Sequence, residues 1–276
     1  MVENLAMGAI KEVELMSSFS ETGDQPALVI PDLEAMPEFV PDWKVLERNA
    51  IVGFDSRDAR ARPFKLLRTQ VAKLLSQKRA RLVGITSAAP NAGKSFLSLN
   101  LAATLSRVAG SRVYLVDLDL RRASVAEELG LEHDFGIADF LEGTTDDLGS
   151  LGWHVNGSNL AIFPTNKATS SSAELIAGER YGQMIEAFRK EADKAIVLFD
   201  LPPAFANDDT MLAMGALDGY IMVVDAGVTT SRQARETLAM LEPAVCLGAV
   251  LNRYSGGIVD HYGYGYGYRD YAKYAE

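Results

Sequence analysis

Five short apolar segments, each ending in a polar residue, constrain the fold of this chain more than any other feature. They cover residues 81–87, 112–117, 195–200, 219–225 and 245–252, and all are dense in Val, Ile and Leu. Helical patterns separate them, at about 95–108, 173–190, 208–217 and 230–242. Strands separated by helices pair in parallel through right-handed crossovers, so the sequence predicts a doubly wound α/β domain. Ligands of such a domain bind at the carboxyl ends of its strands.

A loop that can bind phosphate lies between the first predicted strand and the helix that follows it. Residues 87–95 read SAAPNAGKS, and the N–H groups and positive dipole end of a helix beginning there would face a phosphate. Gly93 lets the backbone approach closely, Lys94 can reach the β and γ phosphates, and the Ser95 hydroxyl can coordinate Mg²⁺. Because Ala88 stands where the motif usually has glycine, the loop is a variant. The predicted nucleotide contacts in this region are Pro90, Asn91, Ala92, Gly93, Lys94, Ser95 and Phe96.

Two of the other predicted strands end in carboxylates that belong to recognisable motifs. Residues 113–122 read VYLVDLDLRR, and Asp117 and Asp119 share one face because side chains alternate along a strand. Two acids beside a phosphate site can hold Mg²⁺ and orient or deprotonate a hydroxyl. Without the loop, a helix cap and a surface acid would be the favoured explanation of these two residues. Residues 195–203 read AIVLFDLPP, so Asp200 ends an apolar strand in the Walker B pattern of a magnesium site.

The sequence predicts a folded middle part of the chain between two segments without regular structure. Residues 1–50 carry prolines among scattered acids with no helical or strand period, so we expect a disordered acidic segment. Residues 51–252 form the predicted nucleotide domain, led by a basic amphipathic helix between residues 57 and 81. That helix either covers the domain or docks an acidic neighbour or anionic lipid. Residues 253–276 form a tail that glycines keep flexible, with tyrosines at Tyr262, Tyr264, Tyr266, Tyr268, Tyr271 and Tyr274.

Charge and composition exclude several classes of protein. The 276 residues include 27 Lys and Arg against 37 Asp and Glu, a net charge of −10 that argues against nucleic-acid binding. Cys246 is the only cysteine, which excludes an internal disulfide and a cysteine-based metal cage. The amino terminus has no signal-peptide pattern and the apolar runs are too short for a membrane span, so we expect a cytoplasmic protein.

The segments SAAPNAGKS, VYLVDLDLRR and IVLFDLPP resemble the bacterial tyrosine kinase family of exopolysaccharide and capsule synthesis. The resemblance runs from about residue 62 to the end and includes the tyrosine-rich tail. It implies a P-loop NTPase fold of the MinD/ParA type with a deviant Walker A motif, and ATP and Mg²⁺ as cofactors. It also implies that the tail tyrosines are phosphorylated between neighbouring molecules.

The same resemblance implies roles for individual residues and partners. Lys94 would bind the β and γ phosphates, and Asp117 would activate the tyrosine hydroxyl. Asp119 and Asp200 would organise the metal with Ser95, and Asn252 would contact the adenine. The implied partners are a transmembrane activator or polysaccharide co-polymerase that recruits the chain to the inner face of the plasma membrane, further copies of the chain, and a phosphotyrosine phosphatase.

Two departures from the family pattern keep other functions open. The interface helix of the family typically reads Glu-x-x-Arg-x-x-Arg, and Arg62, Lys65 and Arg68 stand at those positions here. Ser170–Ser172 replaces a Pro-Asn-Pro segment. A positioning ATPase of the ParA/MinD type is one alternative, although Ala89 stands at the place of its signature lysine and it has no tyrosine tail. A non-catalytic nucleotide-binding regulator of a membrane polysaccharide complex is the other.

Overall fold

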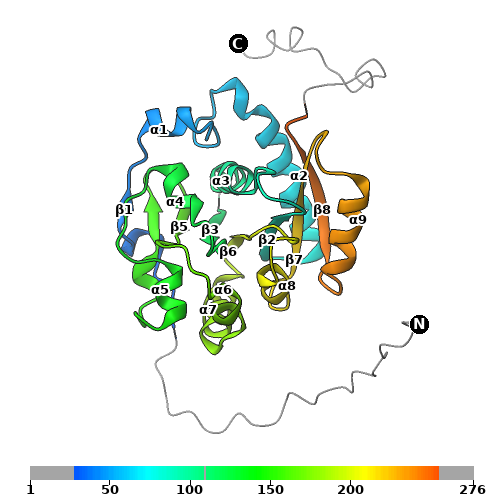
Figure 1. Cartoon of the computed structure of the whole chain (residues 1–276). Helices are drawn as coiled ribbons and strands as arrows, with labels where there is room; N and C mark the ends of the chain where they lie inside the picture. Colours follow the sequence, from blue (N-terminus) through cyan, green and yellow to red (C-terminus); the bar gives the residue numbers. More distant parts are fainter. Residues whose placement is uncertain (1–27, 109, 255–276) are drawn as a thin grey trace, which may run out of the picture.

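The computed structural model describes residues 28–108 and 110–254. Within them, eight strands form one sheet in the order β1-β4-β5-β3-β6-β2-β7-β8 (Figure 1). The strands are β1 (Glu38–Phe39), β2 (Leu82–Ser87), β3 (Arg112–Asp117), β4 (Trp153–Val155), β5 (Leu160–Phe163), β6 (Ala195–Asp200), β7 (Gly219–Asp225) and β8 (Cys246–Asn252). Every neighbouring pair is parallel except β4 with β5. The predicted doubly wound α/β fold is confirmed, and all five predicted strands form.

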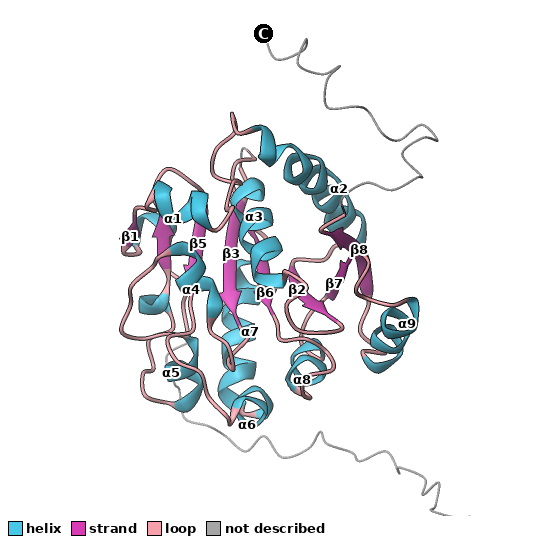
Figure 2. Cartoon of the chain, turned by 45° about the horizontal axis from the view of Figure 1, so that its top comes forward, coloured by secondary structure: helices cyan, strands magenta, loops and turns pink. Residues whose placement is uncertain are grey.

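Helices cover both faces of this sheet, as Figures 1 and 2 show. They are α1 (Trp43–Arg48), α2 (Arg62–Lys78), α3 (Lys94–Leu105), α4 (Ser124–Leu129), α5 (Ile137–Glu142), α6 (Ser172–Ala177), α7 (Glu179–Glu191), α8 (Asp209–Met214) and α9 (Ser231–Met240). Side chains alternate along β3, so Val113 and Leu115 enter the core under α1–α4, whereas Tyr114 and Val116 enter the core under α5–α8. A strand buried on both faces has no polar side to show, which explains the continuous apolar runs in the sequence.

The expected disorder of residues 1–50 is wrong for residues 28–50. Strand β1 pairs with β4 at the edge of the sheet, with Phe39 opposite Val155. Leu33 and Met36 are buried in the core under α5–α8, and Leu46 of α1 is buried in the opposite core. The folded domain therefore includes residues 28–50, and residues 1–27 lie outside the described part of the chain.

The predicted helices form with one adjustment. The pattern at 173–190 is two helices, α6 and α7, which meet at Gly178. The basic helix α2 buries Val71 and Leu75 and lies against α3, where the rings of Phe64 and Phe96 are 5.6 Å apart. This packing agrees with a helix that covers the domain. No helix in the described ranges combines the length and apolarity that a membrane span requires.

Candidate nucleotide-binding site

The loop between β2 and α3 has the geometry of a phosphate cradle. Gly93 precedes α3 with a φ of 88°, a left-handed conformation that favours glycine. A Cβ at this position would lie 2.2 Å from Nδ2 of Asn252, at the end of β8. That amide group donates a hydrogen bond to the carbonyl oxygen of Ala92 at 2.8 Å. Two independent constraints, the backbone conformation and the contact with Asn252, therefore require glycine here.

Lys94, the first residue of α3, reaches across to the acid beyond β3. Its Nζ lies 3.7 Å from Oδ2 of Asp119, and each side chain is only 4% exposed. Burial raises the pKa of Asp119, and the charge of Lys94 opposes that rise. A buried ion pair of this kind holds the Lys94 ammonium at the mouth of the loop, where the β and γ phosphates of a nucleotide would lie.

Ser95 and Asp200 form the second contact of the site. The Ser95 hydroxyl donates to Oδ2 of Asp200 at 2.6 Å, and the Ser98 hydroxyl donates to Oδ1 at 2.9 Å. Burial raises the pKa of Asp200 to about 6, although Lys94 and the Ser95 hydroxyl oppose it. A hydroxyl and a carboxylate from these two motifs are the oxygen ligands that a P-loop protein offers to Mg²⁺.

Asp117 occupies a different position from the other predicted acids. Its side chain is fully buried, and its two oxygens accept the backbone N–H groups of Asp119 at 3.1 Å and Val125 at 3.2 Å. Burial and the nearby charge of Asp200 raise the pKa of Asp117 well above its usual range. The carboxylate therefore shapes the turn between β3 and α4, and in the described part of the chain it bonds only to backbone groups.

The remaining predicted contacts divide between loop and core. Pro90, Asn91 and Ala92 lie in the loop itself. The ring of Phe96 packs against Phe64, so this side chain supports α3 from the core side. The phosphoacceptor candidates Tyr262, Tyr264, Tyr266, Tyr268, Tyr271 and Tyr274 lie outside the described residues.

Several contacts around the site were not predicted. Ser124 Oγ lies 2.8 Å from Ser95 Oγ, and Arg122 Nη1 donates to Oδ1 of Asn91 at 2.9 Å, which places a guanidinium over the loop. Arg121 Nε lies 3.4 Å from the fully buried Asp209 side chain. Among these residues only the Arg121–Arg122 pair carries a sequence signal, its position directly after the second acid. The partners come from distant segments that no local pattern connects to the loop.

Comparison with known proteins identifies the family. Residues 83–261 match the CobQ/CobB/MinD/ParA nucleotide binding domain. The chain belongs to this family. Nucleotide binding by the loop at residues 87–95 agrees with that membership, and so does the parallel sheet with its acid-ended strands.

Individual relatives within the family are tyrosine kinases. The chain is 29% identical to the tyrosine-protein kinase YwqD of Bacillus subtilis over 231 residues, which cover 82% of this chain and 94% of YwqD. It is 28% identical to the tyrosine-protein kinase Wzc of Salmonella typhimurium, but over only 28% of that protein. The solved kinase domain of VpsO is 26% identical with a TM-score of 0.63, and the match covers 71% of this chain and 96% of that domain. These relatives confirm the resemblance to bacterial tyrosine kinases.

Proposed function

We propose that the chain is an ATP-dependent protein-tyrosine autokinase that phosphorylates the tyrosines of its carboxyl-terminal tail in trans. The observation that carries the proposal is the four-residue cluster at the carboxyl ends of β2, β3 and β6. There Lys94 pairs with Asp119 and Ser95 bonds to Asp200. A nucleotide site of this kind, in a chain that also supplies a run of tyrosines, has both the phosphate donor site and the acceptor.

ATP and Mg²⁺ fit the residues of this cluster. The N–H groups at the start of α3 and the Lys94 ammonium would hold the phosphates, and Ser95 with Asp200 and Asp119 would hold the metal. The described residues contain no set of three or more His, Cys, Asp or Glu side chains able to bind a metal by themselves. That agrees with Mg²⁺, which takes one or two protein carboxylates plus substrate phosphates. When bound, Mg²⁺ neutralises charge that develops on the transferred phosphate.

Phosphoryl transfer to tyrosine requires little covalent chemistry from the protein. A bond forms between the tyrosine oxygen and the γ phosphorus, the bond to the β–γ bridging oxygen breaks, and the tyrosine proton moves to a carboxylate. Asp117 is the proposed acceptor, and because each of its oxygens accepts only one backbone N–H group, a lone pair remains for that proton. Asp119 follows two residues later and pairs with Lys94. Activity and pH profiles of Asp117→Asn and Asp119→Asn separate the two roles.

The proposed partners follow from the named relatives. We infer that a transmembrane activator or polysaccharide co-polymerase recruits the chain to the inner face of the plasma membrane, and that a phosphotyrosine phosphatase resets the tail. Copies of the chain would associate with one another without the acid of the family's interface helix, because Arg62 of α2 stands at its position. Arg68 of that helix bonds back to the Thr104 carbonyl of α3 at 3.5 Å, which fixes its side chain against the domain. Phosphorylation would then regulate exopolysaccharide or capsule synthesis.

Incubation of the purified chain with MgATP, with and without the cytoplasmic part of a candidate activator, tests the proposal. Mass spectrometry should locate phosphate on tyrosines between Tyr262 and Tyr274, and Lys94→Met should abolish it. Lys44→Met, which changes an exposed lysine of α1, is the matched control and should leave it intact. Hydrolysis without phosphotyrosine would instead identify a positioning ATPase of the ParA/MinD type, and nucleotide binding without turnover would identify a regulator.

A further inference from the structure

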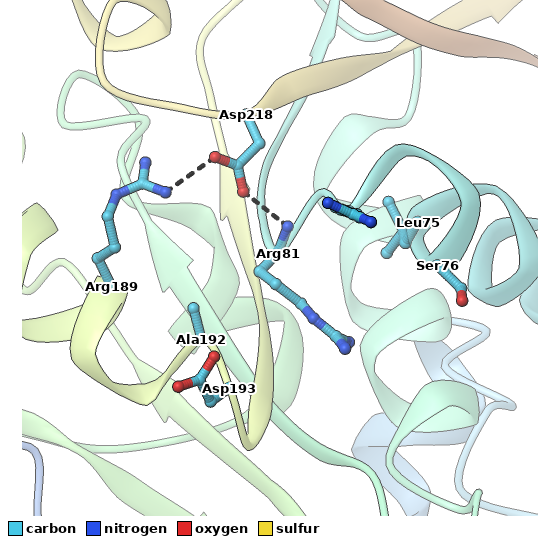
Figure 3. Close-up of a pocket in the computed structure, with 8 residues that line it drawn as sticks. Leu75, Ser76, Arg81, Arg189, Ala192, Asp193 and Asp218 are labelled. Carbon is cyan, nitrogen blue, oxygen red and sulfur yellow. Dashed lines mark hydrogen bonds and ion pairs between the residues drawn. The ribbon is translucent and has the colours of Figure 1, made fainter.

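A second polar cavity lies at the opposite end of β2 from the phosphate loop. It has a volume of about 390 Å³ and is bounded by the carboxyl end of α2, the residue before β2 and the end of α7 (Figure 3). Arg79, Arg81 and Arg189 line it, the first two from the turn between α2 and β2 and the third from α7. Because β2 is six residues long, about 20 Å of strand separates the cavity from the loop that begins α3. The cavity is therefore distinct from the nucleotide site.

The acid at the centre of this cavity is already fully engaged. Asp218 Oδ2 accepts the backbone N–H groups of Arg81 at 2.7 Å and Leu82 at 2.9 Å, and Oδ1 accepts Nη1 of Arg189 at 2.9 Å (Figure 3). The second guanidinium nitrogen of Arg189 donates to the carbonyl oxygen of Ala216 at 2.7 Å. Asp218 and Arg189 thus neutralise each other and fix one wall of the cavity.

The guanidinium groups of Arg79 and Arg81 have no acceptor among the described residues. Arg79 ends α2 in a left-handed conformation with a φ of 53°, which turns the chain so that both arginines line one cavity. Neither guanidinium has a hydrogen bond or ion pair within residues 28–108 and 110–254. The one other acid of the lining, Asp193, is exposed. The cavity therefore holds an excess of positive charge with unused donors.

We propose that this cavity binds an aryl phosphate monoester, namely a phosphorylated tyrosine of residues 262–274. Guanidinium groups match the geometry of phosphate oxygens and form charge-assisted hydrogen bonds with them. Ala192, which is half-buried, gives the lining an apolar part that can contact an aromatic ring. The volume lies within the range of about 300–1,000 Å³ that small-molecule sites occupy. The phosphorylation of the tail rests on the proposed kinase activity, but the binding of a phosphotyrosine in this cavity does not.

The tail is long enough to reach the cavity from the same chain or from a second copy. About 20 residues separate the last described residue, 254, from Tyr274, and a fully extended chain of that length spans about 66 Å. That exceeds the length of β2 roughly threefold. A phosphotyrosine carries a charge of about −1.5 to −2, so only the phosphorylated tail would be attracted. The site would hold the product tail away from the catalytic loop.

Fluorescence anisotropy with a labelled peptide of residues 260–276, phosphorylated on its tyrosines, tests this proposal. The full chain is used as Lys94→Met so that its own tail stays unphosphorylated. We expect the phosphorylated peptide to bind about tenfold or more tightly than the unphosphorylated one, and Arg79→Gln/Arg81→Gln to abolish that difference. Arg81→Gln keeps the backbone N–H group of residue 81, which donates to Asp218. A chain that shows no kinase activity can still bind the phosphorylated peptide, and an active kinase can fail to bind it. The two proposals can therefore fail independently.

A matched control and a competition complete the design. Arg57→Gln/Arg235→Gln removes the same charge from exposed positions outside the cavity and should change affinity by less than about twofold. Phenyl phosphate should displace the peptide at concentrations about tenfold lower than inorganic phosphate does. Equal binding to the cavity variant and the parent chain would overturn the site. Equal competition by inorganic phosphate would overturn its assignment to phosphotyrosine.

Discussion

Asp117 and Asp200 lie directly opposite each other on the neighbouring parallel strands β3 and β6, and both side chains are fully buried. Burial raises the pKa of both carboxyls, and the charge of Asp200 raises that of Asp117 further. An unpaired charge is costly in such an environment. Lys94 compensates part of it. A cation bound at the ends of β3 and β6 would therefore compensate the charge of this pair of acids.

The first prediction concerns a magnesium ion bound beside these two acids. MgADP should raise the melting temperature of the chain more than ADP with EDTA does, and Asp200→Asn should remove the magnesium-dependent part. At a ligand concentration of about 100 times Kd, binding adds about 2.7 kcal/mol to the free energy of unfolding. Thermal melts monitored by fluorescence measure the effect. Asp193→Asn, at an exposed position, should keep the full magnesium increment. A magnesium increment that survives in Asp200→Asn would contradict the assignment of this residue.

The second prediction concerns the glycine of the loop. Gly93→Ala combines a left-handed φ with a Cβ 2.2 Å from Asn252, so it should lower ADP affinity by about tenfold or more. Gly110 also has a positive φ, 75°, but nothing lies within 4 Å of a Cβ there. Gly110→Ala should cost about 1 kcal/mol of stability and leave affinity unchanged. Titration with a fluorescent ADP analogue measures the affinity of both variants. Equal losses of affinity in Gly93→Ala and Gly110→Ala would show that the contact with Asn252 is unimportant.

The central strands and the core of the site were predictable because their signals are local. Strand β6 is buried on both faces and ends in Asp200, so its apolar run and its acid stand together in the sequence. Lys94 and Ser95 follow a glycine between a strand and a helix, a spacing that phosphate binding requires. Once the sheet is parallel, residues at neighbouring strand ends must meet. The proximity of Lys94 to Asp119 and of Ser95 to Asp200 follows from that.

The rest depends on contacts between distant segments. Strand β1 has only two residues and β4 only three, too few to show a period of two. Arg121 contacts Asp209, 88 positions away, and neither residue belongs to a motif shared with the other. The arginine cavity likewise joins α2 to α7 at the amino-terminal end of β2. These features arise from packing of the whole domain, which a single sequence does not encode in any local pattern.

The third prediction tests the corrected boundary of the domain. Leu33 is 3% exposed and belongs to the core under α5–α8. Leu33→Ala should therefore lower the free energy of unfolding by about 2–4 kcal/mol, through lost burial and the cavity left behind. Leu66→Ala, at a position 63% exposed, should change it by less than about 0.5 kcal/mol. Urea denaturation measures both. Indistinguishable midpoints would mean that residues 28–50 contribute nothing to the folded domain.

The fourth prediction concerns Glu128 of α4, whose pKa is raised to about 7 by burial and by the charge of Asp200. An acid with a raised pKa in the folded state is protonated there while it is ionised in the unfolded chain. The loss of free energy of unfolding caused by burying this carboxyl is therefore absent below about pH 4.5 and grows as the pH rises to about 7. Glu128→Gln should stabilise the nucleotide-free chain by about 1–2 kcal/mol at pH 8, after allowance for partial solvent screening, and by nothing measurable at pH 4.5. Melting temperatures between these pH values measure the difference, with Glu132→Gln at an exposed position as the control. A gain that does not vary with pH, or an equal gain in the control, would rule out the burial of Glu128 as its cause.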